Sequence, residues 1–262
     1  MSVKPLLRRI GLLSATVLLA LFTSLAASPA YASTTGNGGG DGGVITPDIV
    51  GGGVVGDVKP WIAALHHDGG FTCTSTQISA SWIITAAHCV PNDTGYSVRI
   101  GSLTRSSGGT VVAVDQVIRH EGFDWPTHDI ALLHLATPFQ NTYVSIAGQS
   151  GDIQLNQALT LYGWGSENPD WSGPLPENLK YADGYLSGTG CHSDAAPLLC
   201  TQTDGSVAGG DSGGPVFVQS PATGGFVQAG VCALGWQPAG NGQAGYTSIP
   251  LHRDWITQHT GV

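Results

Sequence analysis

Three short segments carry side chains that together could perform nucleophilic catalysis. ITAAHCV contains His88, THDIALLHL contains Asp129, and GGDSGGP contains Ser212. A serine hydroxyl is a poor nucleophile at neutral pH, so it needs a base within hydrogen-bonding reach. A neutral imidazole in turn needs a carboxylate that fixes its tautomer and stabilises the cation that forms. The sequence offers one candidate for each of these roles.

Glycines surround the candidate nucleophile in the segment VAGGDSGGPV, residues 207–216. Each glycine loses more conformational entropy on folding than another residue would, so such a cluster needs a geometric reason. We interpret the segment as a turn whose backbone N–H groups come very close to a reacting atom.

The elements that must position these residues follow a segment typical of an export signal. Basic residues precede the apolar run IGLLSATVLLALFTSLAA, and an A-x-A cleavage site ends at Ala32. The run is close to the lower length limit for a membrane span, so a single transmembrane anchor is the alternative. We predict a signal peptide over 1–32 and a secreted, extracellular chain. The glycine-rich stretch 33–48 is interpreted as a pro-segment or a flexible linker.

Charge and composition limit the class of protein further. Removal of the signal would leave six basic residues against eighteen acidic ones, a net charge of −12. Such a surface is unfavourable for nucleic acid and for anionic lipid, so we expect neither a nucleic-acid partner nor a membrane after signal cleavage. Only 10% of residues are charged while glycine reaches 39 residues, which is typical of an all-β domain with many tight turns.

Short β-rich apolar runs begin after Ile49 and predict β-barrels or a sandwich. They read WIAAL, SWIITAA, YSVRI, TVVAVDQVI, DIALLHL, ALTLYGW, GGFVQAGVCAL and AGYTSI. Only PLHRDWITQHT predicts a helix, with Leu251, Trp255 and Ile256 on one face, and we expect it to pack on the second half. The composition changes at QSGDIQLNQ, so we divide the folded part into 49–150 and 151–262.

Five cysteines in an exported chain predict disulfides and leave one thiol over. Cys73 and Cys89 flank an apolar segment, and Cys191 and Cys200 flank a short loop. Cys232, in AGVCALG, is then expected to be a free and buried thiol. The sequence does not fix the connectivity, and an intermolecular bridge through Cys232 is the alternative. A Cys73–Cys89 bridge would contribute about 3 kcal/mol in the chain-entropy model.

Five motifs in one order carry a family resemblance: IVGG at 49–52, TAAHC at 85–89, DIALL at 129–133, GWG at 163–165 and GDSGGP at 210–215. From Ile49 to about its C-terminus, the chain resembles the secreted, bacterial-type serine proteases of the trypsin-like family, which have the chymotrypsin fold. The resemblance implies an all-β fold of two packed six-stranded antiparallel β-barrels with a C-terminal α-helix. It also implies a serine endopeptidase whose catalytic residues lie between the barrels.

The same resemblance gives each catalytic residue a role. Ser212 is expected to form the acyl-enzyme, His88 to act as general base and then acid, and Asp129 to orient the imidazole. The N–H groups of Gly210 and Ser212 would form the oxyanion hole, where the loss of one donor typically raises the barrier by about 2.7–4 kcal/mol.

Ile49 and Asp211 are implied to form the ion pair that activates a zymogen. A free α-amine has a pKa of about 7.7–8.0, so a buried carboxylate is needed to keep it charged. We therefore expect cleavage before Ile49. Asp48 stands where trypsin-type zymogens usually carry Arg or Lys, which predicts an activating protease of a different specificity. If 33–48 is a permanent tether instead, Asp211 needs another partner.

The sequence departs from the family pattern at the specificity pocket. Ala208 replaces a cysteine whose disulfide braces this pocket in many relatives. Ser206 lies at the pocket floor by ungapped counting, and with Val207 and Ala244 it predicts an uncharged pocket that prefers apolar or aromatic side chains. The alternative is Arg or Lys specificity through Asp204, should the unbraced loop shift.

The edge that pairs with the substrate backbone also differs, because Ala233-Leu234-Gly235 replaces the family's Ser-Trp-Gly. Main-chain pairing survives this change. A serine that often hydrogen-bonds the triad aspartate is lost, which predicts a reduced rate.

No cofactor and no metal are expected. Some relatives bind calcium in a loop between the histidine and aspartate motifs. A calcium site needs several oxygen ligands, and the corresponding segment GSLTRSSGGTVVAVD offers the single carboxylate of Asp115. His128 and His134 are interpreted as bystanders, because no Cys/His cluster has zinc-site spacing along the sequence. Protein or peptide substrates, an activating protease and a monomeric state are expected. The alternative from another class is a secreted, non-catalytic binding module on the same fold.

Overall fold

The computed structural model describes residues 49–148, 150–193 and 197–262. The predicted signal peptide and the predicted pro-segment lie outside the described residues. Across the described ranges, no helix is long and apolar enough to cross a membrane.

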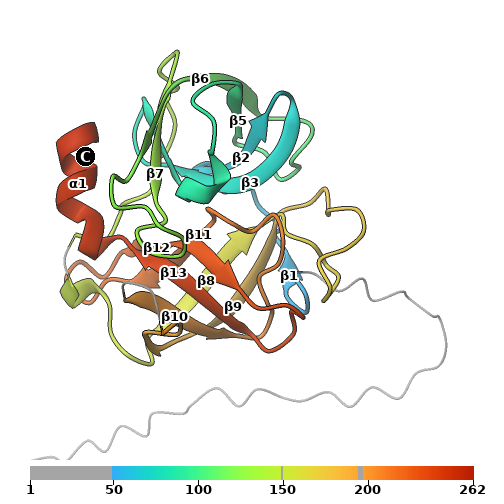
Figure 1. The fold of residues 1–262 in the computed structure, drawn as a ribbon, viewed down its shortest axis with the longest axis vertical. Coiled ribbons are helices and arrows are strands. Elements are labelled where there is room, and N and C mark those ends of the chain that lie inside the picture. The colour runs from blue at the N-terminus through green and yellow to red at the C-terminus, as the bar shows by residue number, and fades with distance from the viewer. Residues whose placement is uncertain (1–48, 149, 194–196) are drawn as a thin grey trace, which may run out of the picture. The chain divides into compact units, whose positions relative to one another are not determined.

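A closed antiparallel barrel of six strands forms the first half of the fold, the upper part of Figure 1. Its strand order is β2-β3-β4-β7-β6-β5. The strands are β2 (Ile62–His67), β3 (Gly70–Gln77), β4 (Trp82–Thr85), β5 (Tyr96–Ile100), β6 (Thr110–Arg119) and β7 (Ala131–Leu135). In β5, YSVRI alternates between buried and half-buried side chains, as expected for a strand with one face on a core. The short helix η1 (Ala87–Cys89) follows β4.

A second barrel follows the η2 turn (Ser150–Asp152). Its strands are β8 (Ala158–Gly163), β9 (Lys180–Thr189), β10 (Leu198–Thr203), β11 (Pro215–Gln219), β12 (Phe226–Gly235) and β13 (Gln243–Ser248). β8 pairs with both β11 and β9, which closes the sheet, and the short β1 (Gly53–Val54) adds to β9 at its outer edge. The predicted fold class, two six-stranded antiparallel barrels with a C-terminal helix, is confirmed. The expected boundary at 149–157 falls between β7 and β8.

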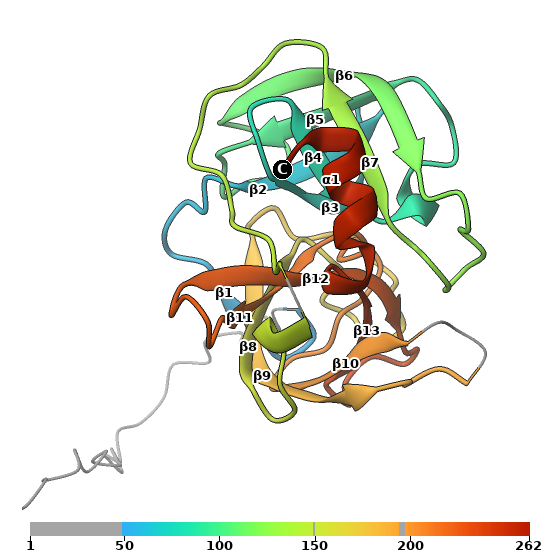
Figure 2. The same cartoon turned by 90° about the vertical axis from the view of Figure 1, so that its left-hand side faces the viewer.

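The C-terminal helix corrects one prediction. Figures 1 and 2 show α1 (Arg253–Thr260), preceded by η3 (Pro250–His252), against the first barrel. Ile256 is fully buried in a hydrophobic cluster made mostly of residues of that barrel, with Phe217, Val231 and Ile249 of the second half. The Trp255 indole N–H donates to Glu121 Oε2, in the β6–β7 connection of the first barrel, at 3.0 Å. The expected packing on the second half is therefore wrong. Leu251 lies in η3 rather than on the apolar helix face, and 62% of its surface is exposed.

The cysteines pair as expected. Cys73 of β3 is bonded to Cys89 of η1, and Cys191 is bonded to Cys200. Cys232 is free and buried, and burial beside Asp211 raises the pKa of its thiol far above the ordinary value. A thiol that is buried and protonated behaves as a small apolar side chain.

Candidate active site

His88 and Asp129 meet because the strands beside them are paired. β4 runs into η1, which carries His88, and Asp129 lies just before β7, with Thr85 opposite Ala131 in the β4–β7 pair. The Asp129 side chain is fully buried, while His88 keeps 29% of its side chain exposed. The first barrel thus holds an imidazole at its surface above a carboxylate in its interior.

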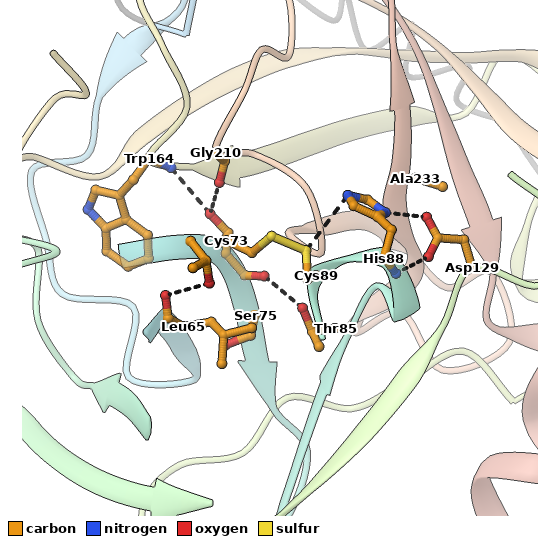
Figure 3. The surroundings of a disulfide bond; sticks show 12 residues. Leu65, Cys73, Ser75, Thr85, His88, Cys89, Asp129, Trp164, Gly210 and Ala233 are labelled. Atoms are coloured by element: carbon orange, nitrogen blue, oxygen red, sulfur yellow. Dashed lines mark hydrogen bonds and ion pairs between the residues drawn. A yellow bond between two sulfur atoms is a disulfide. The ribbon is translucent and has the colours of Figure 1, made fainter. Parts of the chain in front are cut away.

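The carboxylate contacts His88 at two points, as Figure 3 shows. Asp129 Oδ2 lies 2.5 Å from His88 Nδ1, and Oδ1 accepts the backbone N–H of His88 at 2.9 Å. An ionised carboxylate can only accept, so Nδ1 carries the hydrogen and Nε2 keeps a lone pair. This tautomer is the one that a general base requires.

The Cys73–Cys89 disulfide lies directly beside the imidazole (Figure 3). Cys89 Sγ is 3.8 Å from His88 Nε2, and the bridge ties η1 to β3. The residue before His88 and the residue after it are buried, so the short helix that carries His88 is fixed on both sides.

Ser212 lies in a turn that hydrogen bonds attach to both barrels. Its carbonyl accepts the Thr74 N–H of β3 at 2.9 Å, and the following Gly213 N–H donates to Cys232 O of β12 at 2.8 Å. The Thr74 hydroxyl donates to Gly210 O at 3.0 Å. The Ser212 side chain is half-buried, and its Oγ forms no hydrogen bond to any residue that the structure describes.

Two glycines of this turn have conformations and surroundings that only glycine tolerates. Gly210 has φ +107° and Gly213 has φ +76°, both in the left-handed region. A Cβ at Gly213 would lie 2.1 Å from Thr85 Oγ1. Within the described part of the chain, the N–H groups of Gly210 and Ser212 donate to no acceptor. Two backbone donors in the turn that carries Ser212 are therefore unengaged by the described residues.

Asp211 points away from Ser212 into the second half of the fold. Its side chain is buried, and it accepts the Gly165 N–H at 2.7 Å and the Ala208 N–H at 2.9 Å. Burial raises the pKa of Asp211 to about 7, although the two backbone hydrogen bonds oppose this rise. No cation of the described ranges forms an ion pair with it.

Ile49, the predicted partner of Asp211, is fully buried in the apolar cluster that also contains Val207. Its φ is +26°, an uncommon conformation for a β-branched residue. The backbone therefore enters the fold at Ile49 under local strain.

The residues predicted for the specificity pocket are buried and uncharged. Ser206, Val207 and Ala244 are each at most 2% exposed, and Ser206 Oγ accepts the Gly242 N–H at 2.7 Å. Asp204 is exposed instead, and its carboxylate accepts the Asp183 N–H at 2.9 Å. The carboxylate invoked for Arg or Lys specificity thus lies on the outside, bound to β9.

Two tryptophans near these residues were missed by the sequence analysis. The Trp125 indole N–H donates to the Ala233 carbonyl at 3.2 Å, on the edge expected to pair with substrate. Trp171 lies against two glycines: a Cβ at Gly235 would be 3.4 Å from Trp171 Cζ2, and a Cβ at Gly209 would be 3.8 Å from Trp171 Cβ. Large aromatic residues four positions before Asp129 and six after the GWG motif were the available signal.

Leu234, the middle residue of that edge, is buried, and Gly235 and Ala244 are opposite each other in the β12–β13 pair. The indole nitrogen of Trp171 is buried without a hydrogen-bond partner among the described residues. The predicted pocket residues are thus gathered in one place, with Trp171 beside them.

Comparison with known proteins identifies the family of this chain. The trypsin family model matches residues 49–256. Trypsin alpha of Drosophila erecta is 31% identical over 75% of this chain and 81% of its own length. Trypsin beta of the same species is also 31% identical, over 75% of this chain and 82% of its own length. The solved structure of human heparin binding protein superposes with a TM-score of 0.69 over 80% of this chain and 95% of its own, at 21% identity. That likeness concerns the fold alone, whereas the family match and the trypsin relatives show that the chain belongs to the trypsin family of serine proteases.

Proposed function

We propose that the chain is a serine endopeptidase that hydrolyses peptide bonds through an acyl-enzyme on Ser212. The observation that carries the proposal is the combination at the junction of the barrels. An imidazole held by a buried carboxylate occurs together with a serine hydroxyl and two N–H donors that no described residue engages. Each group is one that acyl transfer requires.

The reaction would use the groups as follows. His88 Nε2 takes the proton of Ser212 Oγ while the oxygen attacks the peptide carbonyl. The N–H groups of Gly210 and Ser212 donate to the oxyanion, and Asp129 stabilises the imidazolium. The imidazolium then protonates the leaving amine, and a water molecule activated by His88 releases the acyl group. The absence of a Ser212–His88 hydrogen bond is consistent with catalytic bonds that tighten only with substrate.

We propose further that cleavage between Asp48 and Ile49 activates the enzyme. The raised pKa of Asp211 marks a buried carboxylate with no cation beside it among the described residues, and a new α-amine at Ile49 would supply one. The left-handed φ of Ile49 supports the same step, because cleavage removes the preceding peptide and with it the strain. Asp48 assigns this cleavage to a protease that does not require Arg or Lys.

The pocket is proposed to accept uncharged apolar or aromatic side chains. The support is the burial of Ser206, Val207 and Ala244 and the outward position of Asp204. The substrate backbone would pair with Ala233–Gly235 as an added strand. Secretion, a monomeric state and protein or peptide substrates complete the proposal.

Labelling with a serine-reactive fluorophosphonate, followed by intact mass measurement, tests the proposal. Two preparations are compared, one beginning at Ser33 and one at Ile49, each with a Ser212→Ala control. We expect one adduct on the Ile49 form, little on the Ser33 form and none on the controls. Equal labelling of both forms would overturn the activation step alone. No labelling of either would overturn the enzyme proposal in favour of a non-catalytic binding module.

A further inference from the structure

Three histidines gather beside the active site although they are far apart in the sequence. His120 follows β6, His128 lies in the same β6–β7 connection, and His252 ends η3. One ring nitrogen from each lies within 4.8 Å of the other two. The sequence analysis interpreted His128 as a bystander, because no Cys/His cluster along the sequence has zinc-site spacing. The three histidines are separated by 8 and 124 residues.

The rings pack closely on one another. His120 and His128 are stacked with centroids 4.5 Å apart, and His252 meets both edge-on at 5.1 and 5.2 Å. His128 Nδ1 is only 2.9 Å from His252 Nε2. Around a tetrahedral zinc ion, two ligand nitrogens at about 2.0–2.1 Å from the metal are about 3.4 Å apart. The His128 and His252 nitrogens already lie within this separation, and the His120 nitrogen, at most 4.8 Å from each of them, would have to move toward them.

A backbone contact orients the buried member of the cluster. His252 Nδ1 lies 2.7 Å from the Ser248 carbonyl. A carbonyl can only accept, so Nδ1 carries the hydrogen and the Nε2 lone pair faces His128. Metal-binding histidines usually donate their second ring N–H in this way.

A carboxylate lies next to the cluster. The exposed carboxylate of Glu121 follows His120 directly and accepts the Trp255 indole N–H. His259 lies 3.7 Å from the other oxygen of Glu121.

We propose that His120, His128 and His252 form a binding site for one divalent transition-metal ion of the zinc class, with water in the fourth position. Three imidazoles and an open position suit zinc, whereas calcium and magnesium require oxygen ligands. Two rearrangements are needed. His128 Nδ1 donates to the His252 Nε2 lone pair, so its hydrogen must move to His128 Nε2 before Nδ1 can bind a metal. At His120, the Gly122 N–H donates to Nδ1 at 3.1 Å. Coordination through Nε2 moves the ring hydrogen to Nδ1 and replaces this exposed hydrogen bond.

The bound ion would join two parts of the fold. His128 immediately precedes Asp129, and His252 is the last residue of η3, directly before α1. The metal would therefore fasten the β6–β7 connection to the C-terminal helix, and it would raise the thermal stability of the chain. Binding to the folded state alone always stabilises it.

The test measures metal binding without turnover, so it stands apart from the proposed peptidase activity. Ser212→Ala protein beginning at Ser33, without a polyhistidine tag, is titrated with Zn²⁺ by calorimetry and with Co²⁺ by visible absorption. We expect one ion per chain, the absorption of a four-coordinate Co²⁺ site and an upward shift of the melting temperature.

Single variants locate the site. His120→Gln and His128→Gln, which change half-buried residues, should each weaken binding by more than about tenfold, since even supporting residues of metal sites contribute 10–100-fold. His134→Gln is the matched control, because His134 pairs with Asp115 outside the cluster. Absence of stoichiometric binding in the parent protein would overturn the proposal, and so would binding that His120→Gln and His128→Gln leave unchanged.

Discussion

Asp129 holds His88 through both the ring and the backbone, at 2.5 Å from Nδ1 and 2.9 Å from the peptide nitrogen. The two contacts do different work. The backbone contact fixes the start of η1 relative to β7, and the ring contact selects the tautomer with a free Nε2.

Asp129→Asn should separate these two roles. The amide oxygen can keep one contact, but an amide group favours the wrong imidazole tautomer, so we expect kcat to fall about 10⁴-fold, as the same change does in the reference triad of this family. Hydrolysis of an activated ester by the Ile49 form measures kcat, and circular dichroism checks the fold. An unchanged kcat in a folded variant would contradict the assigned role of Asp129.

Asp211 predicts a pH-dependent stability in the uncut chain. Its folded pKa of about 7 exceeds the ordinary value of about 3.9, so between these values the folded state binds a proton that the unfolded state releases. The free energy of unfolding should therefore fall as pH rises from about 4 to about 7, at up to about 1.4 kcal/mol per pH unit. Urea unfolding of the Ser33 form across this range measures the slope.

Two controls belong to the same measurement. In the Ile49 form the new α-amine should remove most of this slope, because it favours the charged carboxylate. Asp211→Asn should remove it in the Ser33 form. Identical slopes in all three proteins would show that Asp211 does not titrate as proposed.

Trp171→Gly should widen access to the primary pocket. The Trp171 side chain lies against Gly209 and Gly235. The backbone of Trp171 has a φ of +62°, which glycine adopts readily. We expect kcat/KM to rise several-fold for substrates with large apolar or aromatic side chains and to change little for small ones. Asn156→Gly, at a φ of +61° away from the pocket, is the matched control. An equal change for all substrates would argue against a role in selectivity.

Trp125→Phe should make the Ala233 carbonyl available to substrate. The variant keeps an aromatic ring and removes the indole N–H that donates to this carbonyl. A hydrogen bond of this kind is worth about 0.5–1.5 kcal/mol, so kcat/KM for extended peptides should rise about two- to tenfold. A small ester that has no N–H for this carbonyl should show no change. A fall in peptide hydrolysis would instead assign Trp125 to substrate binding.

The sequence predicted those strands whose apolar residues make a visible pattern. YSVRI and TVVAVDQVI correspond to β5 and β6, whereas β3, β9, β10 and β11 were not among the expected runs. β3 reads GFTCTSTQ, and its residues 74–77 are fully buried although polar. Their hydroxyl and amide groups are partly satisfied by bonds to distant carbonyls, such as Ser75 Oγ to Ala63 O. Composition alone cannot reveal such long-range partners.

The residues of the candidate site also divide into those that the sequence reveals and those that it does not. His88, Asp129 and Ser212 stand out because their types and neighbouring glycines or cysteines are unusual. Trp125, Trp171 and the three clustered histidines lie in connections, where position depends on how distant segments are folded together. Ile256 shows the same limit: its helical pattern was correct, but the barrel it packs against was not determined by the local sequence.

Thr74, on β3 of the first barrel, is hydrogen-bonded to the turn that carries Ser212. Its N–H and hydroxyl bind the turn at Ser212 and Gly210, and its hydroxyl oxygen accepts the Trp164 N–H. The second barrel therefore carries Ser212, but a strand of the first barrel fixes the turn in which Ser212 lies. If Ser212 and His88 act together as proposed, neither barrel would be active when expressed alone.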